Sequence, residues 1–271
     1  MNEITIEAGR VQGQYWRDLW RYRELLCFLA WRDILVRYKQ TLIGVAWSVI
    51  RPLLTMIVLT FIFGRLAKMP SGGVPYPIFV FCGMLPWQFF SAAFNESGNS
   101  LVLNSGMISK VYFPRLLIPL GSVITSFIDF IISAILLIVI MFYYGFVPSQ
   151  FILILPFFVM MAFFAAIGVG FWVSALMVKY RDFRFIVPFL VQFGLYLSPV
   201  GFSSKMISSG WNLLYSVNPM VGIINGFRWS ILGTEKMDWI SMIISASGII
   251  LMTISGFIYF RSNERKFADV I

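Results

Sequence analysis

A membrane-spanning helix is predicted for residues 116–146, which read Leu116-Leu-Ile-Pro-Leu-Gly-Ser-Val-Ile-Thr-Ser-Phe-Ile-Asp-Phe-Ile-Ile-Ser-Ala-Ile-Leu-Leu-Ile-Val-Ile-Met-Phe-Tyr-Tyr-Gly-Phe146, with Asp129 as their single charged side chain. A helix needs about 20 such residues to cross a bilayer. The whole chain has this character, since 59% of its residues are hydrophobic and 12% are charged. That composition indicates an integral membrane protein. The 271 residues have room for about six spans and no folded catalytic domain.

The number of spans follows from the other apolar runs and from the positions of the basic residues. The runs cover residues 42–63, 78–94, 116–146, 151–178, 185–202, 211–232 and 239–260. Most of the 21 basic residues cluster before the first run, between the second and third, between the fourth and fifth, and after the last. Basic loops stay in the cytoplasm, so the chain must cross an even number of times. We therefore predict an all-α membrane protein with six spans and both termini cytoplasmic.

The run at residues 211–232 is the one that does not cross. It contains Asn212, Asn218, Pro219, Asn225 and Arg228, which are costly in lipid. We expect residues 203–238 to dip back from the outer side as re-entrant helices that line a pathway, because irregular backbone at membrane depth needs protein or water around it. An outer amphipathic cap is the alternative interpretation.

An interfacial helix is predicted within the cytoplasmic segment 1–40. Aromatic and apolar residues recur at helical spacing among arginines, and Asp33 and Arg37 form an i,i+4 pair. Such a helix lies at the lipid headgroups, unless it is an ordinary anchor without a further role. Its site residues are Trp31, Arg32, Asp33, Arg37, Tyr38 and Lys39. The transmembrane domain then covers residues 41–260, and a cytoplasmic tail covers 261–271.

Several function classes are excluded by what the sequence lacks. It has no histidine, so the commonest general base and metal ligand is missing, and no catalytic or metal site is predicted. It also has no glycine-rich phosphate loop, so any ATP and Mg²⁺ must be bound by another chain and no cofactor is expected in this one. The basic residues act as topology signals, which argues against nucleic acid. Cys27 and Cys82 are predicted on opposite sides and cannot form a disulfide.

Charged residues near the spans have two interpretations. Asp129, deep in a span, is expected to hydrogen-bond a neighbouring helix; a proton-coupled secondary carrier is the remote alternative, since no second intramembrane acid or histidine forms a relay. Arg51 and Glu96 lie at the cytoplasmic ends of the first two spans. They are expected to pair with each other or to contact lipid phosphate.

Five ordered motifs then resemble one family, the membrane subunit of polysaccharide-exporting ABC transporters. They are Trp31-Arg-Asp-Ile-Leu-Val-Arg-Tyr-Lys-Gln-Thr-Leu-Ile-Gly44 leading into a span with Trp47 and Arg51-Pro52, then Lys110-Val-Tyr-Phe-Pro-Arg115, Leu197-Ser-Pro-Val-Gly201, Val217-Asn-Pro-Met220 and Phe260-Arg-Ser-Asn-Glu-Arg-Lys-Phe-Ala-Asp269. The resemblance covers the chain from about Tyr15 onward. Within the family the sequence looks most like O-antigen permeases, with capsule and teichoic-acid permeases as alternatives.

The resemblance implies partners and a docking element. It implies a homodimer above two copies of a cytoplasmic ATPase, exporting a lipid-linked O-polysaccharide across the bacterial inner membrane. Residues 104–116 would be the coupling helix that Pro114 ends, with apolar anchors inside a polar rim, a usual interface anatomy. A plain cytoplasmic turn is the alternative. The coupling residues are Ser109, Lys110, Val111, Tyr112, Phe113 and Arg115, with Tyr112 and Phe113 as anchors.

Aromatic rings are candidates for the substrate pathway, because sugars can lie flat on them and slide. The candidates are Trp47, Phe61, Phe89, Phe90, Tyr196 and Phe202. Polar groups of the outer segment, Arg228 included, are expected to hydrogen-bond sugar hydroxyls. Arg51, Arg37 and Lys39 would draw the lipid diphosphate toward the entrance, since arginine matches phosphate geometry.

Overall fold

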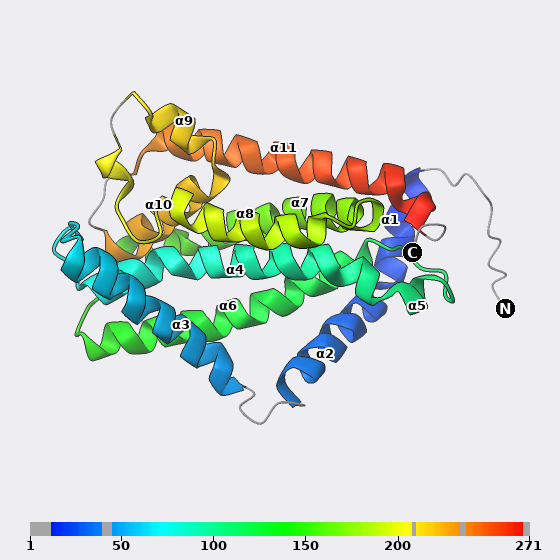
Figure 1. Ribbon diagram of the computed structural model, residues 1–271, viewed down its shortest axis with the longest axis horizontal. Helices are drawn as coiled ribbons and strands as arrows, with labels where there is room; N and C mark the ends of the chain where they lie inside the picture. Colours follow the sequence, from blue (N-terminus) through cyan, green and yellow to red (C-terminus); the bar gives the residue numbers. More distant parts are fainter. Residues whose placement is uncertain (1–11, 40–44, 208–209, 234–236, 268–271) are drawn as a thin grey trace.

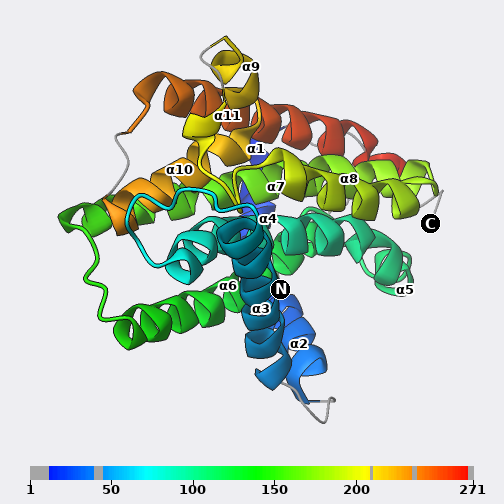
Figure 2. The ribbon, with the colours of Figure 1, turned by 60° about the vertical axis from the view of Figure 1, so that its left-hand side comes forward.

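The computed structural model of the protein describes residues 12–39, 45–207, 210–233 and 237–267, and every regular element in these ranges is helical. The helices that run along the long dimension of the bundle in Figure 1 are α4 (Tyr76–Leu103), α6 (Leu117–Tyr143), α7 (Leu155–Lys179), α8 (Phe183–Leu197) and α11 (Trp239–Asn263). Helix α3 (Val45–Leu59) crosses them obliquely (Figures 1 and 2). The others are α1 (Gln12–Arg21), α2 (Arg23–Lys39), α5 (Ser105–Ile108), α9 (Asn212–Ser216) and α10 (Pro219–Leu232). A π-helical segment, Thr60–Leu66, extends α3, and a 3-10 turn, Gln150–Ile154, leads into α7.

Among the described residues, five helices are long and apolar enough to cross a membrane. They are Ala46–Leu66, Tyr76–Leu103, Leu117–Tyr143, Gln150–Lys179 and Trp239–Asn263. The predicted fifth span, residues 185–202, contains the shorter apolar helix α8 instead. Its helix ends at Leu197 because Pro199 follows, and proline disfavours helical backbone in the residue before it.

Helix α4 is the centre of the bundle, with α6, α7, α8 and α10 packed around it. It continues to Leu103, beyond the predicted end of the apolar run at residue 94. The polar residues that follow the run form hydrogen bonds to carbonyls of the same helix. The Nδ2 of Asn95 donates to the Ser91 carbonyl at 2.9 Å, and the Nδ2 of Asn99 donates to the Asn95 carbonyl at 2.8 Å.

Glycines let α7 approach its neighbours closely. An added Cβ on Gly170 would lie 2.9 Å from the Ser97 hydroxyl of α4, and one on Gly256 of α11 would lie 2.5 Å from the Gly168 carbonyl. Small residues at such crossings allow backbones to pack in van der Waals contact, which is how membrane helices associate. The bundle is therefore held by close backbone contact as well as by side-chain interlocking.

Segments distant in sequence meet at one end of the bundle (Figure 1). There the carboxylate of Glu264, just after α11, accepts hydrogen bonds from the Tyr15 hydroxyl of α1 at 3.3 Å and from the backbone N–H of Arg115 at 2.9 Å. Arg261 lies 3.4 Å over the Tyr15 ring and also pairs with Glu264. Thus α1, the loop after α5 and the end of α11 lie at the same end of the bundle.

The predicted single helix at the N-terminal side is two helices, because the chain turns at Tyr22 between α1 and α2. Helix α2 packs against α6 through Leu29 and Ala30, which are buried. Gly121 of α6 lies at this contact, where an added Cβ would be 3.6 Å from the Leu29 Cβ, an ordinary van der Waals distance. Helix α2 is thus attached to a long helix along one face.

The predicted outer segment contains the buried helix α10, which packs against α4, α7 and α11. Figures 1 and 2 place α9 and α10 toward the end opposite α5. The sequence sets both ends of α10 locally. The Asn218 side chain caps it by accepting from the Met220 N–H, Pro219 occupies its first turn, and Gly233 ends it with a φ of 67°. Residues 208–209 and 234–236 of the predicted segment lie outside the described residues.

Candidate functional site: a polar cleft beside α4

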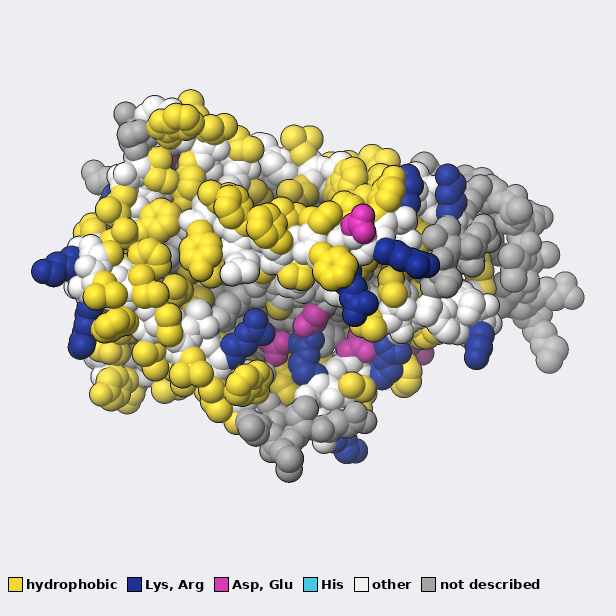
Figure 3. Space-filling view, viewed as in Figure 1, with side chains coloured by type: hydrophobic (Ala, Val, Ile, Leu, Met, Phe, Trp, Pro, Cys, Tyr) yellow, Lys and Arg dark blue, Asp and Glu magenta, His cyan; other side chains and the backbone are white. Residues whose placement is uncertain are grey.

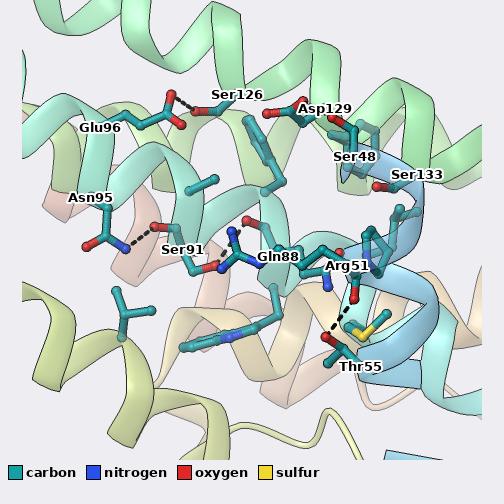
Figure 4. A pocket seen from close by; sticks show the side chains of 18 of the residues that line it. Ser48, Arg51, Thr55, Gln88, Ser91, Asn95, Glu96, Ser126, Asp129 and Ser133 are labelled. Atoms are coloured by element: carbon teal, nitrogen blue, oxygen red, sulfur yellow. Dashed lines mark hydrogen bonds between the residues drawn. The ribbon is translucent and has the colours of Figure 1, made fainter. Parts of the chain in front are cut away.

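A cleft of about 1110 Å³ opens between the end of α2, the first half of α3, the middle of α4, and parts of α6 and α8. Its α3 wall runs from Trp47 to Thr55, and its α4 wall runs from Met84 to Glu96. Figure 4 shows hydroxyl, amide and charged groups on its walls. Amides and charges are costly against lipid, so their concentration here indicates a water-accessible space.

A row of polar side chains on α4 faces this cleft. Gln88, Ser91 and Asn95 all line it, and their spacing of three and four residues puts them on one side of a helix. Figure 4 shows the three following one another along α4. This row was not predicted from the sequence, because residues 78–94 were interpreted only as an apolar run. The signal was present as a polar periodicity of 3.6 residues.

One arginine of α2 holds two carboxylates at the edge of the cleft. Arg37 forms ion pairs with Glu96 of α4 and with Asp129 of α6. The Ser126 hydroxyl donates to Glu96 at 2.9 Å, and the Tyr38 hydroxyl donates to Asp129. Figure 3 shows charged side chains of both signs gathered near α2, on a face that hydrophobic side chains otherwise cover.

The observed ion pairs differ from two pairings expected from the sequence and agree with the expectation for Asp129. Glu96 pairs with Arg37 and not with Arg51, and Asp33 pairs with its neighbour Arg32 at 2.7 Å and not with Arg37. Asp129 does bind a neighbouring helix, as the structural interpretation expected. Since its carboxylate is already paired with an arginine, its geometry gives no support to proton coupling.

Tyr38 and Arg37 of α2 both keep their protons at neutral pH. Burial and the hydrogen bond to Asp129 raise the pKa of Tyr38 to about 12, so its phenol stays protonated and can donate. Burial alone would lower the pKa of Arg37, but the carboxylates of Glu96 and Asp129 raise it overall. Arg37 therefore remains a cation.

Arg51 lies on the α3 wall and is exposed to the cleft. Within the described residues it forms no ion pair, while its backbone carbonyl accepts a hydrogen bond from the Thr55 hydroxyl at 2.9 Å. Its charge is thus available to a ligand. Arg37, by contrast, has its charge matched by carboxylates.

The predicted pathway aromatics separate into three groups. Trp47 lines the cleft and is 57% exposed, whereas Phe89 borders it but is buried among Phe127, Phe130 and Phe163. The others do not line the cleft: Phe90 stacks with Phe94, Phe202 contacts Phe63, and Phe61 and Tyr196 are exposed elsewhere. The cleft brings together one exposed predicted aromatic and the predicted Arg51.

Arg228 does not reach the cleft, because its side chain is buried in the packing of α10. Its guanidinium donates to the carbonyls of Val200 at 2.7 Å and Phe202 at 2.8 Å. It also lies over the Phe79 ring of α4. Arg228 therefore connects the loop after α8 with α4 and α10. This buried position does not fit the sugar-binding role expected from the sequence.

The predicted coupling residues are divided between the surface and the interior. Helical structure covers only Ser105–Ile108 of the predicted residues 104–116. Ser109, Lys110, Val111 and Tyr112 are exposed. Phe113 is 4% exposed and belongs to the core. Arg115 is half-buried, and both its backbone N–H and its guanidinium donate to Glu264.

The remaining interface-helix residues connect α2 to that same end. Arg32 donates to the Asn104 side chain at 2.8 Å and so joins α2 to the chain after α4. Trp31 and Lys39 are exposed on the outside of α2. The part of the chain that the structure describes holds no group of three or more cysteine, aspartate or glutamate side chains placed to bind a metal ion.

Comparison with known proteins matches the family described as ABC-2 type transporter to residues 24–232. The O-antigen export system permease protein RfbA of Klebsiella pneumoniae is 30% identical over 250 residues, which is 92% of this chain and 95% of that protein. RfbA of Myxococcus xanthus is 26% identical over 260 residues, 94% and 98% of the two chains. The polysialic acid transport protein KpsM of Escherichia coli is 26% identical over 78 residues, 29% of this chain and 30% of KpsM.

Proposed function

Because the chain belongs to the ABC-2 type transporter membrane family, we propose that it is the membrane subunit of an ATP-driven exporter of lipid-linked polysaccharide of the O-antigen type. The observation that carries this proposal is the polar cleft beside α4. A polymer of sugars needs hydrogen-bonding walls to cross lipid, and the cleft provides them in a chain that is otherwise apolar. Relatives named as O-antigen permeases along nearly the whole chain support the substrate class.

In this proposal α8 makes the sixth crossing. Its 15 residues extend about 22 Å at the usual rise of 1.5 Å per residue, short of the roughly 30 Å hydrocarbon core. Residues 198–202 would complete the distance. Two of their carbonyls, those of Val200 and Phe202, accept from Arg228, and that of Gly201 accepts from the Tyr76 hydroxyl, which is the kind of satisfaction that backbone at membrane depth requires. With six crossings, α1 and the end of α11 would lie on one side of the membrane, and the basic residues favour the cytoplasmic side of an inner-membrane protein.

A second copy of the chain would close the cleft into a channel. The outward face of α8 carries Phe185, Phe189 and Phe193, all exposed and spaced by one helical turn. A two-fold dimer that packs this face against its copy would join two clefts around one axis. Each protomer then supplies half of the wall, and membrane lipids cover the remaining apolar faces.

The cytoplasmic end is the proposed contact with two copies of a separate ATPase that binds ATP and Mg²⁺. Val111 and Tyr112 are 57% and 55% exposed, beside the basic Lys110, in the loop that joins α4 to α6. Exposed aromatic and apolar residues beside a charge are typical of a docking surface. Because α4 ends and α6 begins at this loop, and both helices line the cleft, a tilt of the loop would move them as rigid bodies.

Among the predicted basic residues, Arg51 is the one placed to meet the lipid diphosphate. It faces the cleft and forms no ion pair with the residues that the structure describes, and an arginine can bind a phosphate through two hydrogen bonds. Arg37 is already paired with carboxylates, and Lys39 is exposed on α2. Arg51 is thus the proposed contact for the charged end of the substrate.

Capsular polysaccharide is the second candidate substrate, favoured by the partial similarity to KpsM. The test is deletion of the gene that encodes this chain from its native cell. The proposal predicts that surface polysaccharide disappears, lipid-linked polymer accumulates inside, and a plasmid copy restores display. Chemical analysis of the accumulated polymer identifies O-antigen or capsule. Unchanged surface polymer, or the absence of any accumulated polymer, would overturn the proposal.

A further inference from the structure

We propose that Gln88, Ser91 and Asn95 of α4 form a hydrogen-bonding track that contacts the hydroxyl groups of the polymer's sugar units. This inference rests on the proposed export function and specifies which part of the substrate each wall recognises. Arg51 would meet the charged diphosphate, whereas the track would meet the neutral sugars that follow it. The sugar contacts are thereby assigned to amides and a hydroxyl on α4, in place of aromatic rings.

The positions of the three residues fit an extended chain. Residues 88 and 95 are seven positions apart, which corresponds to roughly 10 Å along a helix axis. The three side chains form a line and not a closed pocket, and Figure 4 shows this line running along the cleft. A linear polymer that passes along α4 would meet them one after another.

The local hydrogen bonds leave polar groups available in the cleft. The Asn95 Nδ2 and the Ser91 hydroxyl both bond backbone carbonyls one turn earlier in α4, at 2.9 and 3.0 Å. The Asn95 side-chain carbonyl remains as an acceptor. The side-chain amide of Gln88 has no hydrogen-bond partner within the described residues. An amide left in this way inside a membrane needs water or a ligand.

The neutral hydrogen bonds that the track can form are weak enough for a polymer to move along it. A neutral hydrogen bond contributes a modest free energy because it replaces one made to water. A pathway needs contacts that favour entrance but release the substrate again, and several weak contacts in series satisfy both conditions. Sugar hydroxyls both donate and accept, and so can exchange between amide and hydroxyl groups as the chain advances.

A second copy of this chain is the competing occupant, since polar side chains also join membrane helices. The placement of α4 favours the polymer. Helix α4 is the central helix, with its cleft side recessed between α3 and α8, so a partner protomer meets those two helices first. Dimerisation and polymer contact are also separable by measurement.

The test uses Asn95→Ala and Gln88→Ala, with Asn99→Ala as the matched control. Asn99 lies on the same helix and makes the same bond to its own backbone, but does not line the cleft. Alanine preserves the helix. In deletion cells that carry each variant at equal membrane level, we measure surface polymer, cross-linked dimer and co-purified ATPase.

Surface polymer is expected to fall roughly fivefold in Asn95→Ala and Gln88→Ala, the factor associated with one hydrogen bond, while Asn99→Ala stays at the wild-type level. Dimer and ATPase are expected to stay unchanged in all three. Full display by both cleft variants would overturn the track but leave the export function standing, because wild-type complementation reports that function separately. Loss of dimer in parallel with display would show that the row is a protomer contact and would also overturn the track.

Discussion

The guanidinium of Arg228 in α10 lies 3.8 Å from the centre of the Phe79 ring in α4. A cation over an aromatic face is attracted to it, more strongly when water is excluded. The same side chain binds the carbonyls of Val200 and Phe202. One buried arginine therefore joins α4, α10 and the loop after α8.

Replacing this arginine should destabilise the fold. Arg228→Met fills similar space but leaves two carbonyls without donors, which should lower the free energy of unfolding by about 2–4 kcal/mol. Thermal unfolding of the detergent-purified protein measures the loss. Lys205→Met removes an exposed positive charge nearby and should change little. Equal melting temperatures for the two variants would refute the structural role of Arg228.

The close crossing of α7 and α11 gives a second prediction. Gly256→Ala would place a Cβ 2.5 Å from the Gly168 carbonyl, so the helices must separate and stability should fall by about 1–3 kcal/mol. Gly248→Ala, on the same helix, has no heavy atom within 4 Å of its added Cβ and should be neutral or stabilising by up to about 1 kcal/mol. Thermal unfolding compares them. A stable Gly256→Ala protein would show that the crossing is looser than described.

The pairing of Arg37 with Glu96 predicts a non-additive double-mutant cycle. Arg37→Leu leaves two carboxylates without their cation, and Glu96→Leu removes one of them. The losses in unfolding free energy of the two single variants, added together, should therefore exceed the loss in the double variant by about 1–3 kcal/mol. Asp33→Asn, which alters a single half-buried pair between neighbours in the sequence, should cost less than about 1 kcal/mol. Additive effects of Arg37→Leu and Glu96→Leu would indicate that the pair is not coupled.

Substitutions at Tyr112 and Phe113, two neighbouring residues after α5, should have different effects. Tyr112→Ala changes an exposed side chain and should reduce co-purified ATPase roughly tenfold while leaving the melting temperature unchanged. Phe113→Ala empties a core position and should cost about 3–5 kcal/mol of stability. Pull-down and thermal unfolding separate the two effects. Retention of the ATPase by a well-folded Tyr112→Ala protein would mean that this loop is only a turn.

The sequence predicted the parts of the fold that depend on hydropathy, since five of the apolar runs correspond to long helices. The limits of α10 were not predicted, although Asn218, Pro219 and Gly233 set them locally. The end of α4 was placed too early, since hydropathy does not register that Asn95 and Asn99 satisfy themselves on their own helix. The resemblance to the exporter family, based on ordered motifs, was confirmed by comparison.

The candidate site was predicted less well, because it depends on contacts between distant segments. Arg37 and Glu96 are 59 positions apart, and no local pattern could select this partner over Arg51. Phe113 and Tyr112 are adjacent and both aromatic, yet one is in the core and the other exposed. The polar row on α4 is visible in the sequence as a helical periodicity. The sequence does not show which helices face that row.

Photo-cross-linking in exporting cells tests whether the cleft is a wall of the polysaccharide pathway. Benzoylphenylalanine replaces Trp47, in the cleft and 57% exposed, or Phe142, outside the cleft on α6 and 89% exposed. We predict a polymer adduct at position 47 that requires ATP hydrolysis, and none at position 142. Adducts at both positions, or none at position 47 while polymer still reaches the surface, would contradict this prediction.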